Sequence, residues 1–136
     1  MSQNNNIMAF LSNIFSSNSD PKTNLIKWEQ LTTSNQLEEI DTLSETQFVF
    51  IFKHSTRCSV SRFVLNAFER EYKTAKEVAA PFFLDLIAYR EISNEIAARY
   101  EVVHQSPQLI LIKNRRAVYN DSHDGISVEA LEKQLI

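Results

Sequence analysis

The stretch Phe48-Val-Phe-Ile-Phe-Lys-His-Ser-Thr-Arg-Cys-Ser-Val-Ser61 decides the fold of this chain. Its first five residues form a continuous apolar and aromatic run, which is typical of a strand buried on both faces of a helix-covered sheet. Val64, Phe68 and Tyr72 then mark one face of a helix. The stretch therefore predicts a buried strand, a short polar loop and a helix, with Cys58 at the start of that helix.

The sequence on either side repeats this alternation of strand and helix. We expect strands at residues 26–31, 48–52, 82–88, 108–113 and 116–120, and helices carrying Leu37 to Leu43, Val64 to Tyr72, Ile92 to Tyr100 and Val128 to Leu135. Ser34 and Ser127 are the expected helix caps, and Asn114-Arg115 is the expected hairpin turn. The order β-α-β-α-β-α-β-β-α predicts an α/β fold with a central mixed sheet flanked by helices, parallel at first and ending in an antiparallel hairpin.

Composition excludes several function classes. The chain has 136 residues, the length of one ordinary domain, and a net charge of -3 that argues against binding to nucleic acid. Gly125 is the only glycine, so a glycine-rich nucleotide-binding loop cannot exist. A single cysteine cannot form a disulfide within the chain, which excludes a secreted disulfide scaffold.

The polar, low-complexity composition of residues 1–24 predicts a flexible tail. Residues 25–136 are expected to form a single domain. The first basic side chain is Lys22, so no signal peptide is expected, and no apolar run approaches the roughly 18 residues of a membrane span. We therefore expect a cytoplasmic protein without a membrane span.

Cys58 follows the buried strand, at the edge of the sheet where α/β proteins place their sites. The unpaired amides and the positive dipole at a helix N-terminus favour thiolate over thiol. Lys53, Arg57 and Arg62 surround it without an intervening acidic residue, and His54 can add charge. This basic setting would stabilise a thiolate and attract an anionic thiol ligand.

Ser106-Pro107 stands immediately before the fourth predicted strand. Pro107 either occupies a first strand position, where no ladder N–H is missed, or follows a cis peptide bond in a loop that faces the thiol. In the second case, Ser106 would present its backbone to a ligand.

Three segments together resemble the monothiol bacilliredoxins of the YtxJ type, which have a thioredoxin-like fold. They are Lys53-His-Ser-Thr-Arg-Cys-Ser-Val-Ser-Arg62, Ser106-Pro-Gln-Leu-Ile-Leu-Ile-Lys113 and Val118-Tyr-Asn-Asp-Ser-His123. The resemblance covers residues 26–136, and Lys-His-Ser-Thr-x-Cys is its most specific part. It implies a redox protein that removes a low-molecular-weight thiol, typically bacillithiol, from protein mixed disulfides.

On this resemblance Cys58 is the attacking thiol and Pro107 the cis-proline. Ser59 departs from the family, which usually has proline after the active-site cysteine. Ser61 stands where dithiol thioredoxins carry their second cysteine, so an external thiol or reductase must regenerate Cys58. The expected partners are S-thiolated proteins, the small thiol and that reductant, with no bound cofactor and bacillithiol or another low-molecular-weight thiol as co-substrate.

The neighbours of Cys58 have two interpretations each. Arg57 or Arg62 could hold a carboxylate of the small thiol or be a solvated charge, and His54 could donate a proton or be a satisfied strand-end histidine. Thr56 and Ser61 could donate to the sulfur or satisfy the first helical turn. His123 could lie at the rim of the site or simply at the surface.

Other functions compete with the redox hypothesis. The chain could be a thioredoxin-fold interaction protein whose Cys58 is structural or a passive target of thiolation. A peroxide-reducing enzyme would use Thr56 and Arg57 but has no resolving cysteine here. His54, His104 and His123 show no metal-ligand spacing, so we expect no metal site, and a shared iron–sulfur cluster ranks low.

Overall fold

The computed structural model describes residues 26–136, so the predicted tail of residues 1–24 lies outside the described residues. The elements are β1 (Glu29–Gln30), α2 (Asn35–Leu43), β2 (Phe48–His54), α3 (Ser59–Glu71), β3 (Ala79–Asp85), α4 (Arg90–Tyr100), β4 (Gln108–Lys113), β5 (Arg116–Ser122), a 3-10 turn (His123–Gly125) and α5 (Val128–Glu132). Their order confirms the predicted α/β fold.

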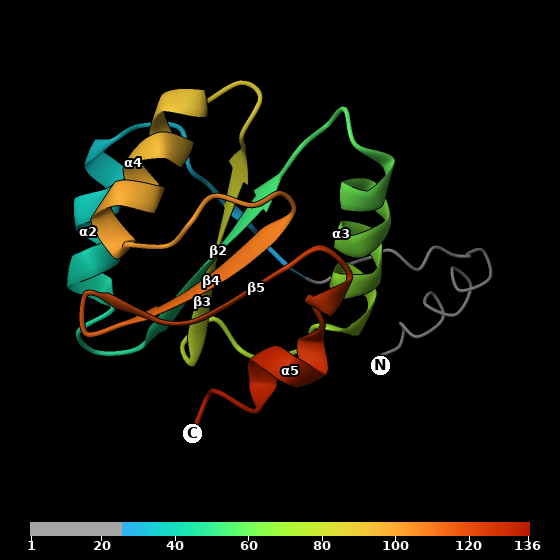
Figure 1. Ribbon diagram of the computed structural model, residues 1–136. Coiled ribbons are helices and arrows are strands. Elements are labelled where there is room, and N and C mark those ends of the chain that lie inside the picture. Colours follow the sequence, from blue (N-terminus) through green and yellow to red (C-terminus); the bar gives the residue numbers. More distant parts are fainter. Residues whose placement is uncertain (1–25) are drawn as a thin grey trace, which may run out of the picture.

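The strands form one mixed sheet in the order β1-β3-β2-β4-β5. β1, β3 and β2 run parallel, whereas β4 is antiparallel to β2 and β5 is antiparallel to β4. Figure 1 shows α2 and α4 on one side of the sheet and α3 on the other. The carboxyl ends of β2 and β3 therefore share one edge of the sheet with the beginning of β4.

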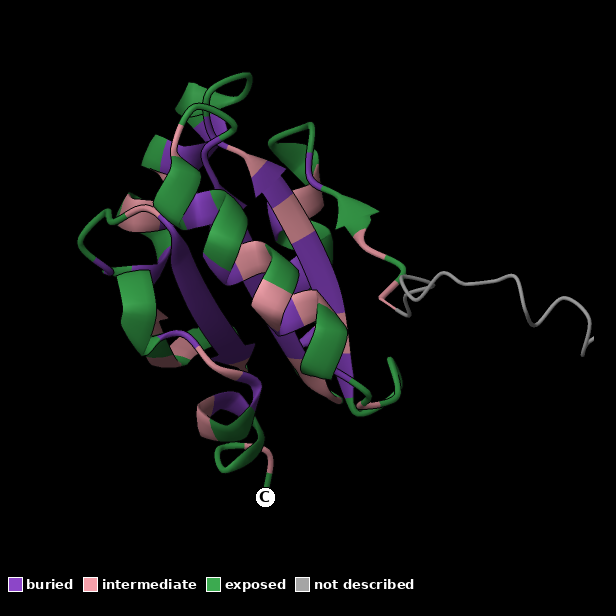
Figure 2. Ribbon diagram, turned by 90° about the vertical axis from the view of Figure 1, so that its right-hand side faces the viewer, coloured by how far each residue is buried: buried purple, intermediate pink, exposed green. Residues whose placement is uncertain are grey.

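Two apolar clusters fill the two faces of this sheet. Val49 and Ile51 of β2 pack with α2 and α4, whereas Phe50 and Phe52 pack with α3 and α5. All four side chains have no exposed surface, and Figure 2 shows buried strands between helices whose outer faces are exposed. Burial on both faces explains why the apolar run of β2 is continuous rather than alternating.

β3 begins and ends earlier than the predicted strand 82–88, and Pro81 lies inside it. The carbonyl of Phe83 accepts a hydrogen bond from the Leu31 N–H, so the backbone groups of Phe83 face β1. Pro81 lies two residues earlier in the strand, so its backbone faces the same side. β1 pairs only with Phe82 and Phe83, so the missing N–H of Pro81 lies beyond the end of β1. β3 ends at Asp85 because its carboxylate accepts the N–H groups of Ile87 and Ala88 in a turn.

Three smaller predictions have different outcomes. The edge strand predicted at 26–31 is reduced to Glu29–Gln30. Ser34 makes no capping hydrogen bond, because its backbone is already helical and its hydroxyl donates to the Glu95 carboxylate. Ser127 does cap α5, since its hydroxyl accepts the Ala130 N–H at 3.0 Å.

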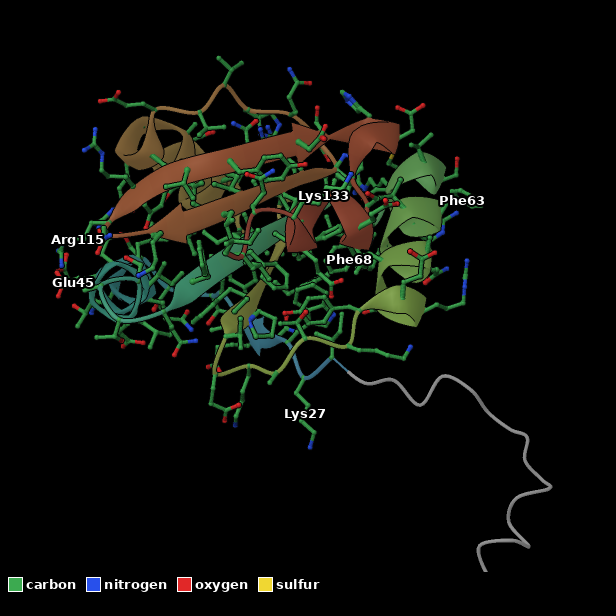
Figure 3. The ribbon with its side chains drawn as sticks, turned by 90° about the horizontal axis from the view of Figure 1, so that it is seen from below. Lys27, Glu45, Phe63, Phe68, Arg115 and Lys133 are labelled. Carbon is green, nitrogen blue, oxygen red and sulfur yellow. The ribbon has the colours of Figure 1, made fainter. Side chains whose placement is uncertain are left out.

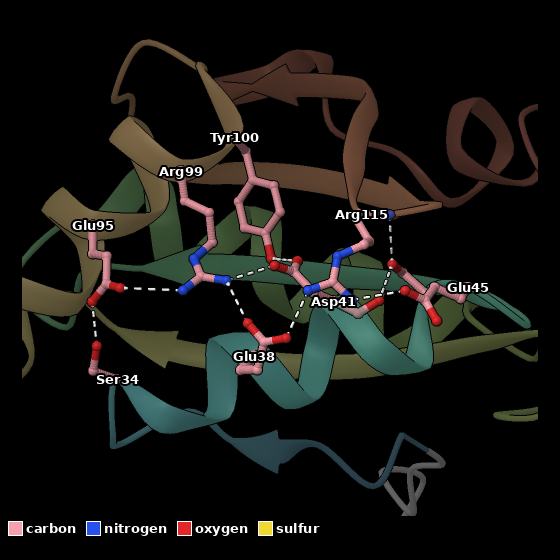
Figure 4. Close-up of polar contacts among 9 residues, drawn as sticks. Ser34, Glu38, Asp41, Glu45, Glu95, Arg99, Tyr100 and Arg115 are labelled. Carbon is pink, nitrogen blue, oxygen red and sulfur yellow. Dashed lines mark hydrogen bonds and ion pairs between the residues drawn. The ribbon is translucent and has the colours of Figure 1, made fainter.

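A polar network ties α2, α4 and the β4–β5 hairpin together at the opposite edge of the sheet (Figure 4). The buried carboxylate of Asp41 accepts hydrogen bonds from Tyr100 and Arg99. Arg115 lies in the two-residue hairpin turn that the sequence predicts, and its guanidinium pairs with Glu38 and Glu45. This network is structural and lies away from Cys58.

Candidate active site

Cys58 is the N-cap residue of α3, with extended backbone angles (φ -116°, ψ 120°) and a partly exposed side chain. Its N–H donates to the Ser55 carbonyl at 3.2 Å, and its own carbonyl accepts the Arg62 N–H at 3.1 Å. The thiol therefore lies at the start of a 13-residue helix, whose first-turn amides have no partner within the helix. The N-terminus of a helix attracts negatively charged groups in general, so the fold places the thiol where an anionic ligand can bind.

The loop before Cys58 is held by a buried hydrogen-bonded group. The Ser61 hydroxyl, which is fully buried, accepts the Ser55 N–H at 3.1 Å and lies 2.8 Å from Nδ1 of His54. Burial, followed by the charge of Arg62, lowers the pKa of His54 despite the opposing charge of Asp85. A neutral His54 can therefore accept the hydroxyl proton of Ser61, and this contact joins the end of β2 to the first turn of α3.

Residues 55–58, here named the thiol loop, have an exposed outer rim together with the first turn of α3. Thr56, Arg57, Ser59 and Arg62 all have exposed side chains, and the Arg62 guanidinium donates to the Thr56 carbonyl at 3.4 Å. Arg57 and Arg62 thus supply the accessible positive charge of this rim. Apolar surface accompanies it, because Phe63 is 73% exposed on the outer side of α3, whereas Phe68 points toward the sheet (Figure 3).

The loop before β4 reaches the same edge of the sheet. The Ser106–Pro107 peptide bond is cis, and the Pro107 carbonyl accepts the His123 N–H at 3.0 Å. Gln108, the first residue of β4, pairs with Lys53 near the end of β2. The Ser106 hydroxyl is buried and has no hydrogen-bond partner among residues 26–136. The fold therefore places the segments of Cys58 and Pro107 at one edge, with the exposed His123 beside Pro107.

Lys53 lies at this edge too, but its ammonium is not part of the exposed rim. The side chain is fully buried, and Nζ lies 2.8 Å from Nδ1 of His104, in the loop before Pro107. Burial and the charge of Arg90 lower the pKa of Lys53 from 10.5 to about 8. Burial and the charges of Lys53 and Arg90 also lower the pKa of His104.

A family model of monothiol bacilliredoxin BrxC matches residues 29–131. This chain belongs to the monothiol bacilliredoxin family. The match spans almost all of the described residues and includes both Cys58 and Pro107. It supports a thiol oxidoreductase-like role for this bacilliredoxin and confirms the resemblance inferred from the sequence.

Solved structures confirm the thioredoxin fold of this bacilliredoxin. A candidate oxidoreductase with a thioredoxin fold is 28% identical, with a TM-score of 0.65 over 76% of this chain and 89% of that one. The thioredoxin of Malassezia sympodialis is 13% identical, with a TM-score of 0.64 over 83% and 91%. The thioredoxin of Fasciola hepatica is 20% identical, with a TM-score of 0.58 over 79% and 95%. The last two show the fold alone.

Sequence reasoning missed the polar residues that hold the loop before β4. The sequence-based predictions treat His104 as a candidate metal ligand and Gln108 as the start of a strand, but they give neither of them, nor Ser93, a role in holding this loop. One signal was present, because Lys53 continues an otherwise apolar buried strand and so needs a polar partner. Among residues 26–136, no three His, Cys, Asp or Glu side chains are placed to hold a metal ion, and no helix is long and apolar enough to cross a membrane.

Proposed function

We propose that this protein removes a low-molecular-weight thiol, with bacillithiol as the first candidate, from the mixed disulfides of other proteins. The observation that carries the proposal is a single, partly exposed thiol at the N-terminus of α3, with Ser61 in place of a second cysteine. A lone thiol suits this task, because it can take over the small thiol without closing an internal disulfide.

The reaction is two thiol–disulfide exchanges. The Cys58 thiolate attacks the small-thiol sulfur of a protein–S–S–R bond, forming Cys58–S–S–R and releasing the protein as a thiolate that takes up a proton. A second thiolate R′S⁻ then attacks the R sulfur, which yields R–S–S–R′ and restores the Cys58 thiolate. The second thiol or an external reductase supplies both electrons, so no bound cofactor is needed. We place this exchange in the cytoplasm, where thiols are kept reduced.

The exposed guanidinium groups suggest how an acidic small thiol would be bound. Arg57 and Arg62 flank the thiol and have no acidic partner within ion-pair distance among the described residues. Guanidinium groups bind carboxylates with paired hydrogen bonds, so these two residues are the proposed contacts for carboxylates of the small thiol.

The test uses one reporter protein thiolated with either bacillithiol or glutathione. We expect the wild-type protein to release the small thiol and to gain one adduct of that thiol by intact mass, and Cys58→Ser to do neither. Native Cys58 should also react with iodoacetamide at pH 6.5 faster than free glutathione does. No release from either reporter, with labelling of Cys58 only after denaturation, would leave the interaction-protein hypothesis in its place.

A second comparison tests the arginines. We expect Arg57→Gln and Arg62→Gln to slow the reaction of the bacillithiol reporter, with Arg70→Gln, an exposed arginine in the last turn of α3, as the matched control. Equal rates for all three variants would reject the assignment of carboxylate binding to Arg57 and Arg62.

A further inference from the structure

Lys53 carries a buried ammonium with an unusual environment. No carboxylate among residues 26–136 lies within ion-pair distance of its Nζ, and His104 Nδ1 is its hydrogen-bond partner there. Arg90, at the start of α4, is a second positive charge near it. A buried ammonium without a carboxylate is costly, so an apolar side chain would suit this position better if only packing mattered.

The partner of Lys53 belongs to residues 103–107, here named the proline loop. Gln108 also holds this loop, because its side-chain amide donates to the Val103 carbonyl at 3.0 Å and its Oε1 accepts the Gln105 N–H at 3.3 Å. Lys53 and Gln108 are directly paired residues of β2 and β4. Two neighbouring strands therefore contact the proline loop through adjacent buried side chains.

His54 makes a corresponding contact on the other face of the sheet. Successive residues of a strand point to opposite faces, so Lys53 faces α4 and His54 faces α3. His54 contacts Ser61, which in turn holds Ser55 in the thiol loop, whereas Lys53 contacts His104 in the proline loop. The last two residues of β2 thus hold two segments that lie at the edge of the sheet that carries the candidate active site.

We propose that Lys53 is a positioning residue, whose ammonium holds His104 and thereby fixes the proline loop against the thiol loop for exchange with protein disulfides. The catalytic meaning of this inference rests on the proposed function, but the contact itself does not. The inference explains why β2 carries a buried ammonium. A long side chain that ends in a hydrogen-bond donor is needed to reach His104 of the proline loop from the end of β2.

The contact is sensitive to pH. Nδ1 of His104 accepts from the ammonium only while the imidazole is neutral, since an imidazolium would face the positive charges of Lys53 and Arg90. Ser93 of α4, whose hydroxyl lies 3.5 Å from Nδ1, is uncharged and cannot offset them. Acid should therefore release the proline loop, at a pH below the ordinary value for histidine because the pKa of His104 is lowered.

The experiment compares four single variants and one double variant of the full chain by the ratio of two rates. One is exchange with a thiolated protein, which must dock against the proline loop, and the other is alkylation of Cys58 by iodoacetamide, which need not. Lys53→Met and His104→Leu remove the contact. His104→Asn keeps an acceptor near the position of Nδ1 but cannot be protonated. Tyr72→Phe, which removes a buried hydrogen bond to Ala79 elsewhere, is the control for the loss of a buried hydrogen bond outside the site.

We expect the ratio to fall about tenfold in Lys53→Met and His104→Leu, since small misplacements of a site reduce rates by such factors. The ratio should stay within about twofold of the wild-type value in Tyr72→Phe and in His104→Asn. In acid the ratio should fall for the wild-type protein but not for His104→Asn, because asparagine cannot be protonated there. The double variant Lys53→Met/His104→Leu should be no worse than either single variant. A ratio that Lys53→Met leaves within twofold of wild type would overturn the proposal.

Hydrogen exchange separates this inference from the proposed function. The Gln105 amide should exchange faster in Lys53→Met and His104→Leu than in the wild-type protein, and unchanged protection would reject the holding contact. If wild-type protein catalysed no exchange with thiolated proteins, the proposed function and the catalytic role of Lys53 would both fail. Hydrogen exchange would still decide whether Lys53 holds the loop.

Discussion

Lys53 illustrates how one residue can serve a site at the expense of stability. Lys53 is the last residue but one of β2, all the residues before it in that strand are apolar, and its side chain has no exposed surface. Burial lowers the pKa of Lys53 from 10.5 to about 8, so the folded protein holds this proton less tightly than the unfolded chain does, although the ammonium still predominates at pH 7. At neutral pH the folded protein must therefore keep a charge that its surroundings disfavour.

We predict that Lys53→Met stabilises the protein at pH 7. The pKa difference, 10.5 minus about 8, corresponds to about 3 kcal/mol, from which the lost hydrogen bond to His104 removes about 1 kcal/mol. The unfolded chain binds the proton more tightly, so wild-type stability rises between pH 8 and about 10.5, and the advantage of Lys53→Met should shrink over that range. Urea unfolding at pH 7 and pH 10 measures this. A destabilised variant at pH 7 would contradict it.

Ser59, the residue after the thiol, offers a second test. It is the first residue of α3, where proline is compatible with the helix because the N–H there has no partner within the helix. We predict that Ser59→Pro leaves the free energy of unfolding unchanged or raises it by up to about 1 kcal/mol. The same change removes one amide near the sulfur, so alkylation of native Cys58 should slow. Faster alkylation, with stability unchanged, would show that this amide does not favour the thiolate.

The links between elements depend on a few buried polar groups. α2, α4 and the hairpin are connected through Asp41, whose side chain is 7% exposed, and through exposed pairs of Arg115. Buried and exposed ion pairs differ in energy, because removing one partner of a buried pair leaves an unpaired charge. Exposed pairs are screened by water and contribute little.

We predict that Asp41→Ala costs about 3 kcal/mol of folding free energy, because the Arg99 guanidinium and the Tyr100 hydroxyl lose their buried acceptor. Glu45→Ala removes only an exposed partner of Arg115 and should cost less than about 0.5 kcal/mol. Chemical denaturation of both variants tests the contrast. If the two variants lost similar amounts of unfolding free energy, the number of contacts in the network, rather than the burial of Asp41, would determine its contribution to stability.

The two apolar clusters share the strands of a single sheet, so disruption of those strands removes the packing surface of both faces. Trp28, the only tryptophan, reports on one face, because its ring packs against Phe50, Phe52, Phe68 and Phe83. Its indole N–H also donates to Glu69 of α3 at 2.7 Å. Tryptophan fluorescence therefore follows the packing of α3 against the sheet.

We predict that urea unfolds residues 26–136 in one cooperative transition. Trp28 fluorescence, far-ultraviolet circular dichroism and hydrogen exchange of the α4 amides, which lie on the other face, should give the same free energy of unfolding. A lower value for the α4 amides than for Trp28 would show that the two faces separate before the sheet unfolds.

The order of elements was accessible from local patterns. The apolar run Phe48–Phe52, the helical spacing of Val64 and Phe68 and the turn Asn114-Arg115 all depend on neighbours close in the chain. The ends of elements were less accessible, because they depend on tertiary contacts. Pro81 enters β3 since β1 is too short to need its N–H, and Asp85 ends that strand by binding the next turn.

Some features of the candidate site could likewise be inferred from the sequence, whereas others depend on tertiary packing. The position of Cys58 at the start of a helix follows from the sequence, and the cis bond before Pro107 follows from the family resemblance. Arg57 and Arg62 could be recognised as charges beside the thiol. The sequence could not show that Ser61 contacts His54 rather than capping the helix, because the side chains of both are oriented by the packing of α3 on β2.

The sequence alone therefore determined the succession of strands and helices, the place of the only thiol and the family. Periodicity and local turn chemistry act over a few residues, so they can be recognised without the rest of the chain. Tertiary structure alone decided the order of strands in the sheet and the partners of its buried polar groups. Lys53 and His104 are 51 positions apart, and their contact exists only because β2, α4 and the proline loop pack around one sheet edge. A buried donor requires a partner, but only the packing of distant segments determines which one it meets.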